Sequence, residues 1–458
     1  MHNFVGIIMA AGHGTRMKSN TPKVLHKVFN KTMLHHCATS LVNAGANHLI
    51  FIIGHGRELV KKEIESWDFS QINISIAVQE EQLGTGHAAL AAIPYIPDNI
   101  NNIVVMYGDT PLVRSETVFN LIDNHIKNNR SLSLVSTIVE QSTGYGRIVR
   151  DTNGVLQKIV EEKDANAIEK SIKEINPGLY CFSRSDFLKS LEKINNNNAQ
   201  KEYYLTDTIE ILLSEKNMVD AMITDSFEDF LGINNRIQLS NVTKIMQKRI
   251  NESHMLNGVT FIDSSTSYID NDVVIEQDTI IYPNTTISGK SIIGQSCKIG
   301  PNTTIKDTLI GIGSKIESST IVESIIGNDT NVGPYAYLRP KSKLGNNVKI
   351  GDFVEVKNAT IGNGSKASHL SYIGDAVVGE GVNLGCGVIT VNYDGDKKHI
   401  TTVEDNVFVG CNSNLIAPVI VGAGAYVAAG TTVTENVIPK ALAIGRVRQE
   451  NKQNWKKK

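Results

Sequence analysis

The stretch KLGNNVKIGDFVEVKNATIGNGSKASHLSYIGDAVVGEGVNLG, residues 343–385, decides the fold of the C-terminal part of this chain. It repeatedly places an aliphatic residue before glycine, and many such pairs recur six residues apart between about Val273 and Val437. A six-residue period is neither helical nor simple strand alternation. It is typical of a hexapeptide-repeat parallel β-helix, in which each rung forms one flat side of a triangular coil and stacked coils bury the aliphatic side chains. Gly, Asn and Asp are expected at the corners, where φ is positive. The alternative, a glycine-rich all-β domain, requires the in-phase pairs to coincide by chance.

Length and composition bound the remaining possibilities. A chain of 458 residues is too long for one hydrophobic core, so two or three domains are expected. The formal net charge of −2 provides no field that would attract nucleic acid. The 5 cysteines form no disulfide-like pattern, and neither a signal peptide nor a long apolar run is apparent. We therefore expect a soluble, cytoplasmic protein that acts on small molecules and does not insert into a membrane.

The first half alternates predicted strands and helices. The expected strands are Val5–Ala10, His48–Ile53, Ile74–Gln79, Ile103–Tyr107 and Leu132–Val139. The expected helices are Met33–Ala44, Arg57–Ser66, Gly86–Ala92 and Ser115–Asn128. This alternation predicts a doubly wound, Rossmann-like α/β sheet, whose ligands bind beyond the carboxyl ends of the strands.

A glycine loop follows the first predicted strand, and Pro22-Lys23 comes shortly after it. Glycines let backbone N–H groups approach phosphate oxygens, and Arg16 and Lys23 can neutralise phosphate charge. Met17 stands where a dinucleotide fold has its third glycine, and the second strand does not end on an acidic residue. A P-loop is excluded because no Lys-Ser/Thr pair directly follows the second glycine, Gly14. The loop alone fits either a phosphate site or a tight strand-to-helix turn.

The two halves are joined by a segment with helical periodicity. Leu239, Val242, Met246 and Ile250 recur at helical spacing, with charged and polar residues between them. We therefore predict an α/β domain at residues 1–236, a linker helix at 237–257 and a hexapeptide-repeat domain at 258–458.

Several motifs together resemble a known family. Ala10–Met17 followed by Pro22-Lys23 resembles the signature of the sugar-1-phosphate nucleotidyltransferases. Further matches, in chain order, are Gln79, Gln82–Ala88, Tyr107-Gly108-Asp109, Gly144–Arg147, Val160-Glu161, Asn176 and Gly232–Asn235. With the repeats behind them, nearly the whole chain resembles the bacterial bifunctional N-acetylglucosamine-1-phosphate uridyltransferases and glucosamine-1-phosphate acetyltransferases. The resemblance implies a left-handed β-helix, a homotrimer whose acetyl-transfer sites lie between chains, and synthesis of UDP-N-acetylglucosamine for peptidoglycan and lipopolysaccharide.

The resemblance also implies roles for residues of the first half. Asp109 and Asn234 would hold Mg²⁺ through oxygen ligands, and Arg16 and Lys23 would stabilise charge during catalysis. The site for UTP and the sugar nucleotide would comprise Met9, Ala10, Ala11, Gly12, Lys23, Gln79, Gly84, Thr85, Tyr107, Gly108, Asp109, Gly146, Glu161, Asn176 and Asn234. Gln79, Gly84 and Thr85 would contact uracil, and Gly146, Glu161 and Asn176 the N-acetyl sugar. Position 13, often lysine in the family, is His13 here and need not be charged at neutral pH.

In the second half the resemblance implies an acetyltransferase site. His369 would be the catalytic base that acetyl transfer to an amine needs, and Glu355 would orient it. The glucosamine-1-phosphate ligands would be Arg339, Lys357, Tyr372 and Asn383, and the acetyl-CoA ligands would be Cys386, Asn392, Tyr393, Cys411, Ala429 and Arg446. The repeats are expected to break near Leu338-Arg339-Pro340 and again at Val391–Thr401. Cys386 replaces the family's usual alanine, and Cys411 replaces its usual serine, which removes a hydroxyl contact.

Other interpretations remain open at this point. Asp109 alone could be a turn or cap residue, and His369 alone could be an ordinary surface histidine. The β-helix could be an oligomerisation scaffold behind a monofunctional nucleotidyltransferase. A zinc-binding prism of the γ-class carbonic anhydrase kind needs three histidines, whereas the repeat body offers only His369, since His399 falls in the second irregular stretch. Cys386 and Cys411 are disfavoured as thiol acyl carriers because neither belongs to a His-x-Cys arrangement.

Overall fold

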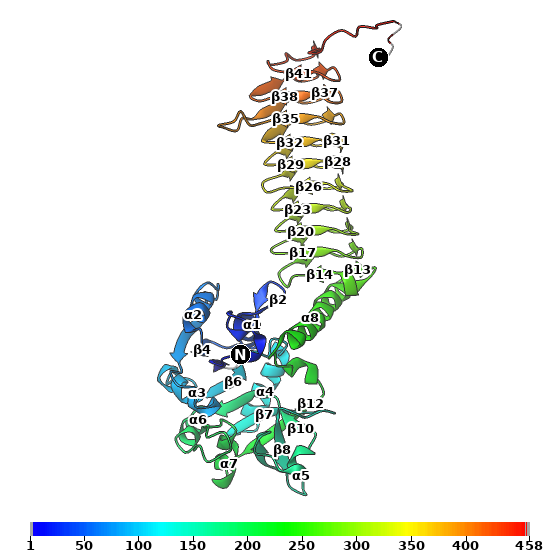
Figure 1. Ribbon diagram of the computed structural model, residues 1–458. Coiled ribbons are helices and arrows are strands. Elements are labelled where there is room, and N and C mark those ends of the chain that lie inside the picture. Colours follow the sequence, from blue (N-terminus) through cyan, green and yellow to red (C-terminus); the bar gives the residue numbers. More distant parts are fainter. Residues whose placement is uncertain (1–2, 454, 456–458) are drawn as a thin grey trace. The chain divides into compact units, whose positions relative to one another are not determined.

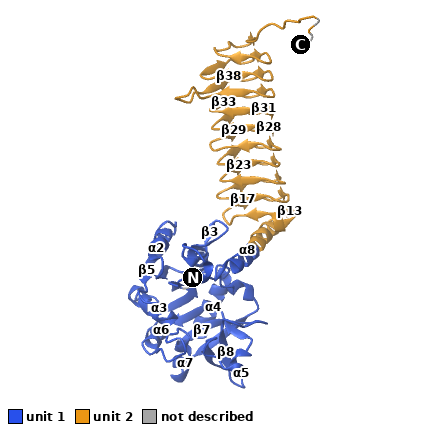
Figure 2. Cartoon of the chain, in the orientation of Figure 1, with its two compact units in different colours: residues 1–246 blue, residues 247–458 orange. Residues whose placement is uncertain are grey.

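A computed structural model describes residues 3–453 and residue 455. The chain divides into two units, residues 1–246 and 247–458 (Figure 2). The division falls inside α8 (Arg236–Leu256), the helix that the sequence predicts at the junction. The three-part division at residues 236 and 257 stays a prediction. Residues 1–2 of its first part and residues 454 and 456–458 of its last part lie outside the described residues. No described helix combines the length and apolar character that a membrane-spanning segment needs.

The first unit is built on one mixed β-sheet with helices on its faces (Figure 1). Its strands are β1 (Phe4–Ala10), β4 (His48–Ile53), β5 (Asn73–Val78), β6 (Asn102–Tyr107), β7 (Leu132–Ile138), β8 (Gly146–Arg150), β9 (Leu156–Val160), β10 (Glu174–Asn176), β11 (Tyr180–Ser183) and β12 (Val219–Thr224). A separate small ribbon comprises β2 (Lys27–Val28) and β3 (Lys31–Thr32). The helices are α1 (Met33–Asn43), α2 (Arg57–Glu65), α3 (Thr85–Ala92), α4 (Ser115–Lys127), α5 (Ala167–Lys170), α6 (Arg184–Leu191) and α7 (Asp207–Ser214).

The order of this sheet is β5-β4-β1-β6-β11-β7-β10-β8-β9, with β12 also paired to β7. The strands β5, β4, β1 and β6 run parallel, as the alternation of predicted strands and helices requires. Beyond β6 the sheet departs from a purely parallel arrangement, because β11 pairs antiparallel with both β6 and β7. The parallel half places the carboxyl ends of β1 and β6 side by side, and the candidate site lies there.

Both faces of the sheet are buried, which explains the nearly continuous apolar runs of its strands. Along β1, Val5 and Ile7 belong to one hydrophobic cluster, whereas Phe4 and Ile8 belong to another. This period-two alternation is that of a strand covered on both sides. The helix α1 begins where the Thr32 side chain accepts a hydrogen bond from the His35 backbone N–H, at 3.2 Å, as an N-cap does.

The second unit is a parallel β-helix with three sheets in the described part of the chain (Figure 1). The first sheet contains β13 (Thr260–Phe261), β16 (Ile280–Ile281), β19 (Lys298–Ile299), β22 (Lys315–Ile316), β25 (Asn331–Val332), β28 (Lys349–Asp352), β31 (Lys366–His369), β34 (Asn383–Leu384), β37 (Phe408–Val409), β40 (Tyr426–Val427) and β42 (Leu442–Ala443). The second contains β14 (Tyr268–Ile269), β17 (Thr286–Ser288), β20 (Thr304–Lys306), β23 (Thr320–Val322), β26 (Tyr337–Leu338), β29 (Glu355–Lys357), β32 (Tyr372–Gly374), β35 (Ile389–Val391), β38 (Asn414–Ile416) and β41 (Thr432–Val433). The third contains β15 (Val274–Ile275), β18 (Ile292–Ile293), β21 (Leu309–Ile310), β24 (Ile325–Ile326), β27 (Lys343–Leu344), β30 (Thr360–Ile361), β33 (Ala376–Val378), β36 (Thr401–Val403) and β39 (Val419–Val421).

Each coil stacks in register on its neighbours, and the aliphatic residue of each rung points inward. Ile281, Ile299 and Ile316 pair in succession and are fully buried. Each such side chain contributes about 1.5–3 kcal/mol by leaving water. The corners have positive φ, as expected for Asn347 (φ 56) and Gly364 (φ 69), but also for the bulky Leu370 (φ 45).

Of the two breaks expected in the repeats, the structure contains one. Leu338 pairs with Ile321 below it and Val356 above it, so the coil continues regularly through Leu338-Arg339-Pro340, and that expectation is wrong. Pro340 is tolerated because it follows the strand rather than lying within it. The second break is real: between β35 and β36 the chain leaves the coil and forms a loop with a Tyr393–Lys398 bridge. Figure 1 shows this loop projecting from the β-helix at the level of β35.

Candidate active sites

The glycine loop of the first unit joins β1 to two short 3-10 turns, Thr15–Met17 and Lys23–Leu25. Gly14 has φ +61, and a Cβ added there would lie 2.6 Å from the Cβ of Lys23. Only glycine therefore lets the loop fold back against Lys23. At Gly14 the loop backbone thus packs closely against the Lys23 side chain, which a tight turn alone would not require.

Four of the predicted residues meet at the carboxyl ends of β1 and β6. The Lys23 ammonium donates hydrogen bonds to Asp109 Oδ2 at 2.5 Å and to Asn234 Oδ1 at 3.1 Å. Arg16 Nη2 donates to the same Asn234 oxygen at 3.0 Å. Asn234 reaches this place because the Ile233 N–H donates to the Asp109 carbonyl at 3.0 Å. Residues from three distant segments thus form one polar cluster, which we call the Lys23–Asp109 cluster.

The oxygen atoms of this cluster suit a magnesium ion. Asp109 Oδ2 and Asn234 Oδ1 already converge on one cation, the Lys23 ammonium. Mg²⁺ prefers such hard oxygen ligands and completes its shell with water and substrate phosphates. Within residues 3–453, no group of three or more His, Cys, Asp and Glu side chains is arranged to hold a metal by itself. Asp109 and Asn234 therefore suit a magnesium site in which substrate phosphates and water supply the remaining oxygen ligands.

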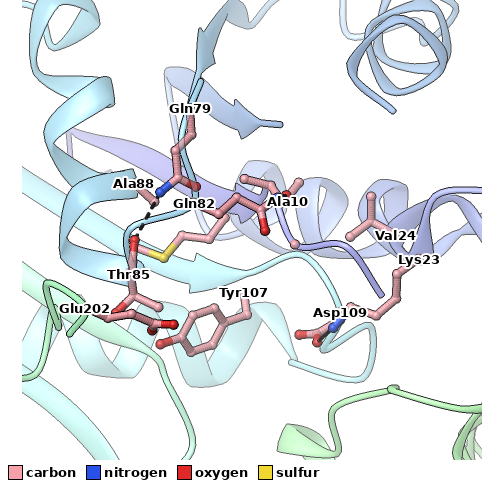
Figure 3. Close-up of a pocket in the computed structure, with 14 residues that line it drawn as sticks. Ala10, Lys23, Val24, Gln79, Gln82, Thr85, Ala88, Tyr107, Asp109 and Glu202 are labelled. Carbon is pink, nitrogen blue, oxygen red and sulfur yellow. Dashed lines mark hydrogen bonds and ion pairs between the residues drawn. The ribbon is translucent and has the colours of Figure 1, made fainter. Parts of the chain in front are cut away.

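A cavity of about 250 Å³ opens beside this cluster. It is lined by Met9, Ala10, Ala11, Gly12, Lys23, Val24, Gln79, Gln82, Gly84, Thr85, Ala88, Tyr107, Asp109 and Glu202. Figure 3 shows Lys23 and Asp109 at one end of it and Gln79 with Thr85 at the other. The cavity is therefore long enough to bring a charged end and an amide-lined end of one ligand into contact with the protein.

The amide-lined end of the cavity is held by hydrogen bonds to a distant segment. Gln79 Nε2 donates to the Gly84 carbonyl at 3.1 Å, and the Gly86 N–H donates to the Tyr203 carbonyl at 2.7 Å. Thr85 Oγ1 accepts from the Leu205 N–H at 3.0 Å. Gly84 has φ +109, and a Cβ there would lie 2.8 Å from the Tyr203 backbone nitrogen. These contacts fix the backbone groups of residues 84–86 against residues 203–205.

A second cavity, of about 370 Å³, shares Tyr107 and Asp109 with the first. Its walls include Gly146, Glu161 and Asn176, the three residues expected to hold the N-acetyl sugar. Burial raises the pKa of Glu161, and its Oε1 accepts a hydrogen bond from Thr206 Oγ1 at 3.0 Å. The structure thus brings the residues predicted to bind the sugar and those predicted to bind the nucleotide together around one shared carboxylate, that of Asp109. Gly108 precedes that carboxylate and is tied to β1 by its N–H, which donates to the Met9 carbonyl at 2.9 Å.

In the β-helix, His369 has a carboxylate partner, and that partner is Asp352. His369 Nδ1 lies 2.5 Å from Asp352 Oδ1, and the two residues pair across β28 and β31. The hydrogen bond from His369 lowers the pKa of Asp352, so the carboxylate accepts and Nδ1 carries the proton. His369 Nε2 is then left as the basic nitrogen. Leu370, directly after His369, occupies a corner of the coil with φ 45°, as Phe353 does one coil earlier with φ 56°.

Glu355, which the resemblance assigns to His369, contacts a different side chain. Its Oε1 accepts from Arg339 Nη1 at 2.8 Å. Arg339 and Lys357 follow the paired residues Leu338 and Val356, so the two predicted phosphate ligands occupy equivalent positions in neighbouring coils. Tyr372 pairs with Glu355 on the next coil of the same sheet. The predicted sugar-phosphate residues thus share one face of the β-helix, formed by β26, β29 and β32, whereas Asn383 lies on β34 in the adjacent sheet.

The predicted acetyl-CoA residues follow one edge of the β-helix. The pairs Ala367–Leu384, Leu384–Val409 and Val409–Val427 set the register. Two residues after each paired position stand His369, Cys386, Cys411 and Ala429. We call this column the His369 edge. Arg446 follows β42, the last strand of the same sheet.

Asn392 and Tyr393 begin the projecting loop, and Asn392 Nδ2 lies 3.5 Å from the Tyr372 hydroxyl oxygen. Asn392 is buried, and its Nδ2 donates to Asp375 Oδ2 at 2.5 Å. The other oxygen of Asp375 accepts from Asn358 Nδ2, also at 2.5 Å. Asp375 therefore holds the root of the loop, a role that the sequence did not reveal. Both Asp352 and Asp375 could have been found by counting 17 residues, one coil, back from His369 and Asn392.

Comparison with known proteins defines first a class and then a family. Residues 5–235 match the nucleotidyl transferase family, and residues 272–307, 323–358 and 400–435 match the bacterial transferase hexapeptide family. The fold is therefore that of a two-unit transferase in which a nucleotidyl transferase precedes a left-handed hexapeptide β-helix. The bifunctional protein GlmU of Clostridioides difficile (strain 630) is 52% identical over 456 residues, which cover 100% of this chain and 98% of that protein.

Other relatives agree over the same length. The bifunctional GlmU proteins of Geobacillus sp. (strain WCH70) and Carboxydothermus hydrogenoformans are 51% and 48% identical, and each match covers at least 98% of this chain and 96% of the relative. The chain belongs to the bifunctional GlmU family.

Proposed function

We propose that the chain catalyses two consecutive reactions. The β-helix unit transfers the acetyl group of acetyl-CoA to the amine of α-D-glucosamine 1-phosphate. The first unit then couples N-acetylglucosamine 1-phosphate to UTP, which yields UDP-N-acetylglucosamine and pyrophosphate. The observation that carries the proposal is the presence, in one bifunctional GlmU family member, of both the Lys23–Asp109 cluster and the His369–Asp352 pair.

In uridylyl transfer, a sugar-phosphate oxygen attacks the α-phosphorus of UTP and pyrophosphate leaves. The protein's task is to position two polyanions and to offset their charge. Arg16 and Lys23 supply fixed positive charge at the shared boundary of the two cavities. Asp109 and Asn234 would hold Mg²⁺, which when bound neutralises phosphate oxygens. Substrate entry requires Lys23 to exchange its contact with Asp109 for contacts with phosphate.

The cavities separate the two ends of the sugar nucleotide. Uracil would contact Gln79, Gly84 and Thr85, whose positions are fixed by residues 203–205. The N-acetyl sugar would lie against Glu161 and Asn176 in the second cavity. Because Tyr107 and Asp109 line both cavities, the reacting phosphorus would lie beside Asp109.

In acetyl transfer, the amine of glucosamine 1-phosphate attacks the thioester carbonyl. His369 Nε2 would remove the proton that the nitrogen loses, and Asp352 would hold the ring by accepting from Nδ1–H. Arg339 and Lys357 would bind the sugar phosphate. Coenzyme A would follow the His369 edge toward Ala429 and Arg446, with Asn392 and Tyr393 beside the acetyl group. Asn383 lies between the sugar and cofactor groups in chain order.

We further propose a cytoplasmic homotrimer. The third sheet of the β-helix exposes a continuous aliphatic ladder, Val274, Ile292, Leu309 and Ile325, each 44–51% exposed. Exposed apolar ladders of this kind favour association, and hexapeptide prisms of the family associate in threes. The proposed location rests on the 5 cysteines, which form no disulfide-like pattern in the sequence.

A split assay with two variants tests the bifunctional proposal. His369→Ala should abolish CoA release from acetyl-CoA and glucosamine 1-phosphate while sparing pyrophosphate release from UTP and N-acetylglucosamine 1-phosphate. Asp109→Ala should do the reverse, and each variant thus serves as the control for the other. Pyrophosphate release without any CoA release from the unaltered protein would favour the alternative, a monofunctional nucleotidyltransferase with a β-helix scaffold.

A further inference from the structure

Two thiols of this chain occupy equivalent positions on neighbouring coils. Leu384 of β34 pairs with Val409 of β37, and Cys386 and Cys411 each follow two residues later. The Asn412 N–H donates to the Cys386 carbonyl at 2.7 Å, so the in-register pairing continues through both cysteines. Neighbouring strands lie about 4.8 Å apart, which is within the Cα separation of about 4.4–6.8 Å that a disulfide spans.

These two thiols differ from the other cysteines in their access to solvent. Cys411 is exposed and Cys386 is half-buried, whereas Cys37, Cys181 and Cys297 are buried. Burial also raises the pKa of Cys37 to about 12, so that thiol is protected from oxidation in two ways. A soluble oxidant therefore reaches Cys411 first and finds Cys386 one coil away.

The pair lies on the His369 edge, between the proposed catalytic base and Ala429. Under the proposed function, on which this functional consequence rests, acetyl-CoA follows that edge. A covalent link between the two side chains would stand where the cofactor passes. Acetyl transfer would stop, whereas the nucleotidyl transferase site lies in the other unit and would be unaffected.

We propose that Cys386 and Cys411 form an oxidisable dithiol that blocks acetyl transfer when it closes to a disulfide. The oxidant is a peroxide. The Cys411 thiolate attacks one peroxide oxygen, the O–O bond breaks, and Cys411 becomes a sulfenic acid as an alcohol or water leaves. The Cys386 thiol then attacks the sulfenic sulfur, the S–S bond forms, and water leaves with the remaining proton. The two thiols lose two electrons and the peroxide gains them.

The test compares the full-length protein with Cys386→Ala, Cys411→Ser and the double variant, before and after hydrogen peroxide. Peptide mapping after alkylation under denaturing conditions should find a Cys386–Cys411 disulfide, which dithiothreitol removes. Acetyl transfer of the unaltered protein should fall about tenfold or more on oxidation and recover on reduction, while pyrophosphate release persists. The double variant should lose no acetyl transfer on oxidation, and neither single variant should form the Cys386–Cys411 link.

Two results would overturn the inference: mapping that finds no Cys386–Cys411 link after oxidation, or an equal loss of acetyl transfer in the double variant. The failure of the proposed function is a separate outcome, since it would show as an absence of CoA release before any oxidant is added. In that case the mapping experiment still decides whether the dithiol closes.

Discussion

Replacing Asp352 by asparagine tests how His369 is oriented. The carboxylate accepts a hydrogen bond from His369 Nδ1 at 2.5 Å and so keeps the proton on that nitrogen. An asparagine amide can turn its NH₂ toward Nδ1 and favour the other tautomer, in which Nε2 carries the proton and is no longer basic. We therefore expect Asp352→Asn to lower kcat for acetyl transfer and to leave KM for glucosamine 1-phosphate nearly unchanged.

The size of the effect follows from the exposure of the pair. A general base contributes about 10²–10⁴-fold to a rate, which sets the ceiling reached by removing His369 itself. The side chains of His369 and Asp352 are 58% and 37% exposed, so water can replace part of what the carboxylate does. The loss should therefore lie below this range, at about tenfold in kcat. Pyrophosphate release by the same preparation should not change.

The matched control is Glu355→Gln, one rung away. Because Glu355 holds the Arg339 guanidinium at 2.8 Å, this change should alter KM for glucosamine 1-phosphate and keep kcat within about twofold. Steady-state kinetics with a thiol reagent for free CoA measure both quantities. A tenfold fall in kcat for Glu355→Gln, together with normal kcat for Asp352→Asn, would refute the assignment of Asp352 as the orienting residue.

Two further predictions concern the first unit. Gly84→Ala introduces a Cβ at a residue with φ +109, 2.8 Å from the Tyr203 backbone nitrogen. The substitution should raise KM for UTP about tenfold without affecting acetyl transfer. An unchanged KM would mean that the Gly84 backbone does not contribute to the uracil-binding end of the cavity. Burial and the nearby Glu161 raise the pKa of Asp207 to about 6, so between about pH 4 and pH 6 the folded chain retains a proton that the unfolded chain has released, and stability falls as pH rises through this window. Asp207→Asn should therefore raise the free energy of unfolding of the first unit at pH 8 by about 1–2 kcal/mol, a value reduced from about 3 kcal/mol because the side chain is partly exposed to solvent. At pH 4 the substitution should have no effect. Thermal unfolding followed by tryptophan fluorescence measures both, and an equal stabilisation at the two pH values would contradict the prediction.

The fold could be predicted because its determinants are local. A six-residue period needs no knowledge of distant contacts, and the strand predicted at His48–Ile53 is β4 itself. The antiparallel placement of β11 between β6 and β7 could not be predicted, since nothing in a short strand specifies its neighbours. The same reason explains why only the resemblance, and no periodicity, joined Asn234 to Asp109, which meet across more than a hundred residues.

The assignment of Glu355 shows where a resemblance and a register can disagree. In a β-helix, residues one coil apart stack, and the coil below His369 begins 17 residues earlier, at Asp352. Glu355 is instead 17 residues before Tyr372, its strand partner. Counting one coil back from His369 would therefore have identified Asp352, its hydrogen-bonding partner. The reason is that the backbone ladder, and not the nature of the side chains, sets which residues stack.

The in-register stacking of coils along the His369 edge sets the distance between its residues. From His369 to Ala429 the edge rises by three coils, through Cys386 and Cys411, and each coil adds about 4.8 Å, so the whole distance is about 14 Å. The loop between Val391 and Thr401 lengthens the chain without adding to this distance, since it leaves the coil after β35 and rejoins the same coil at β36. The length of ligand that can bind along such an edge therefore changes only in steps of one coil. Insertions at the corners change what surrounds the ligand, and only the gain or loss of a complete coil changes its reach.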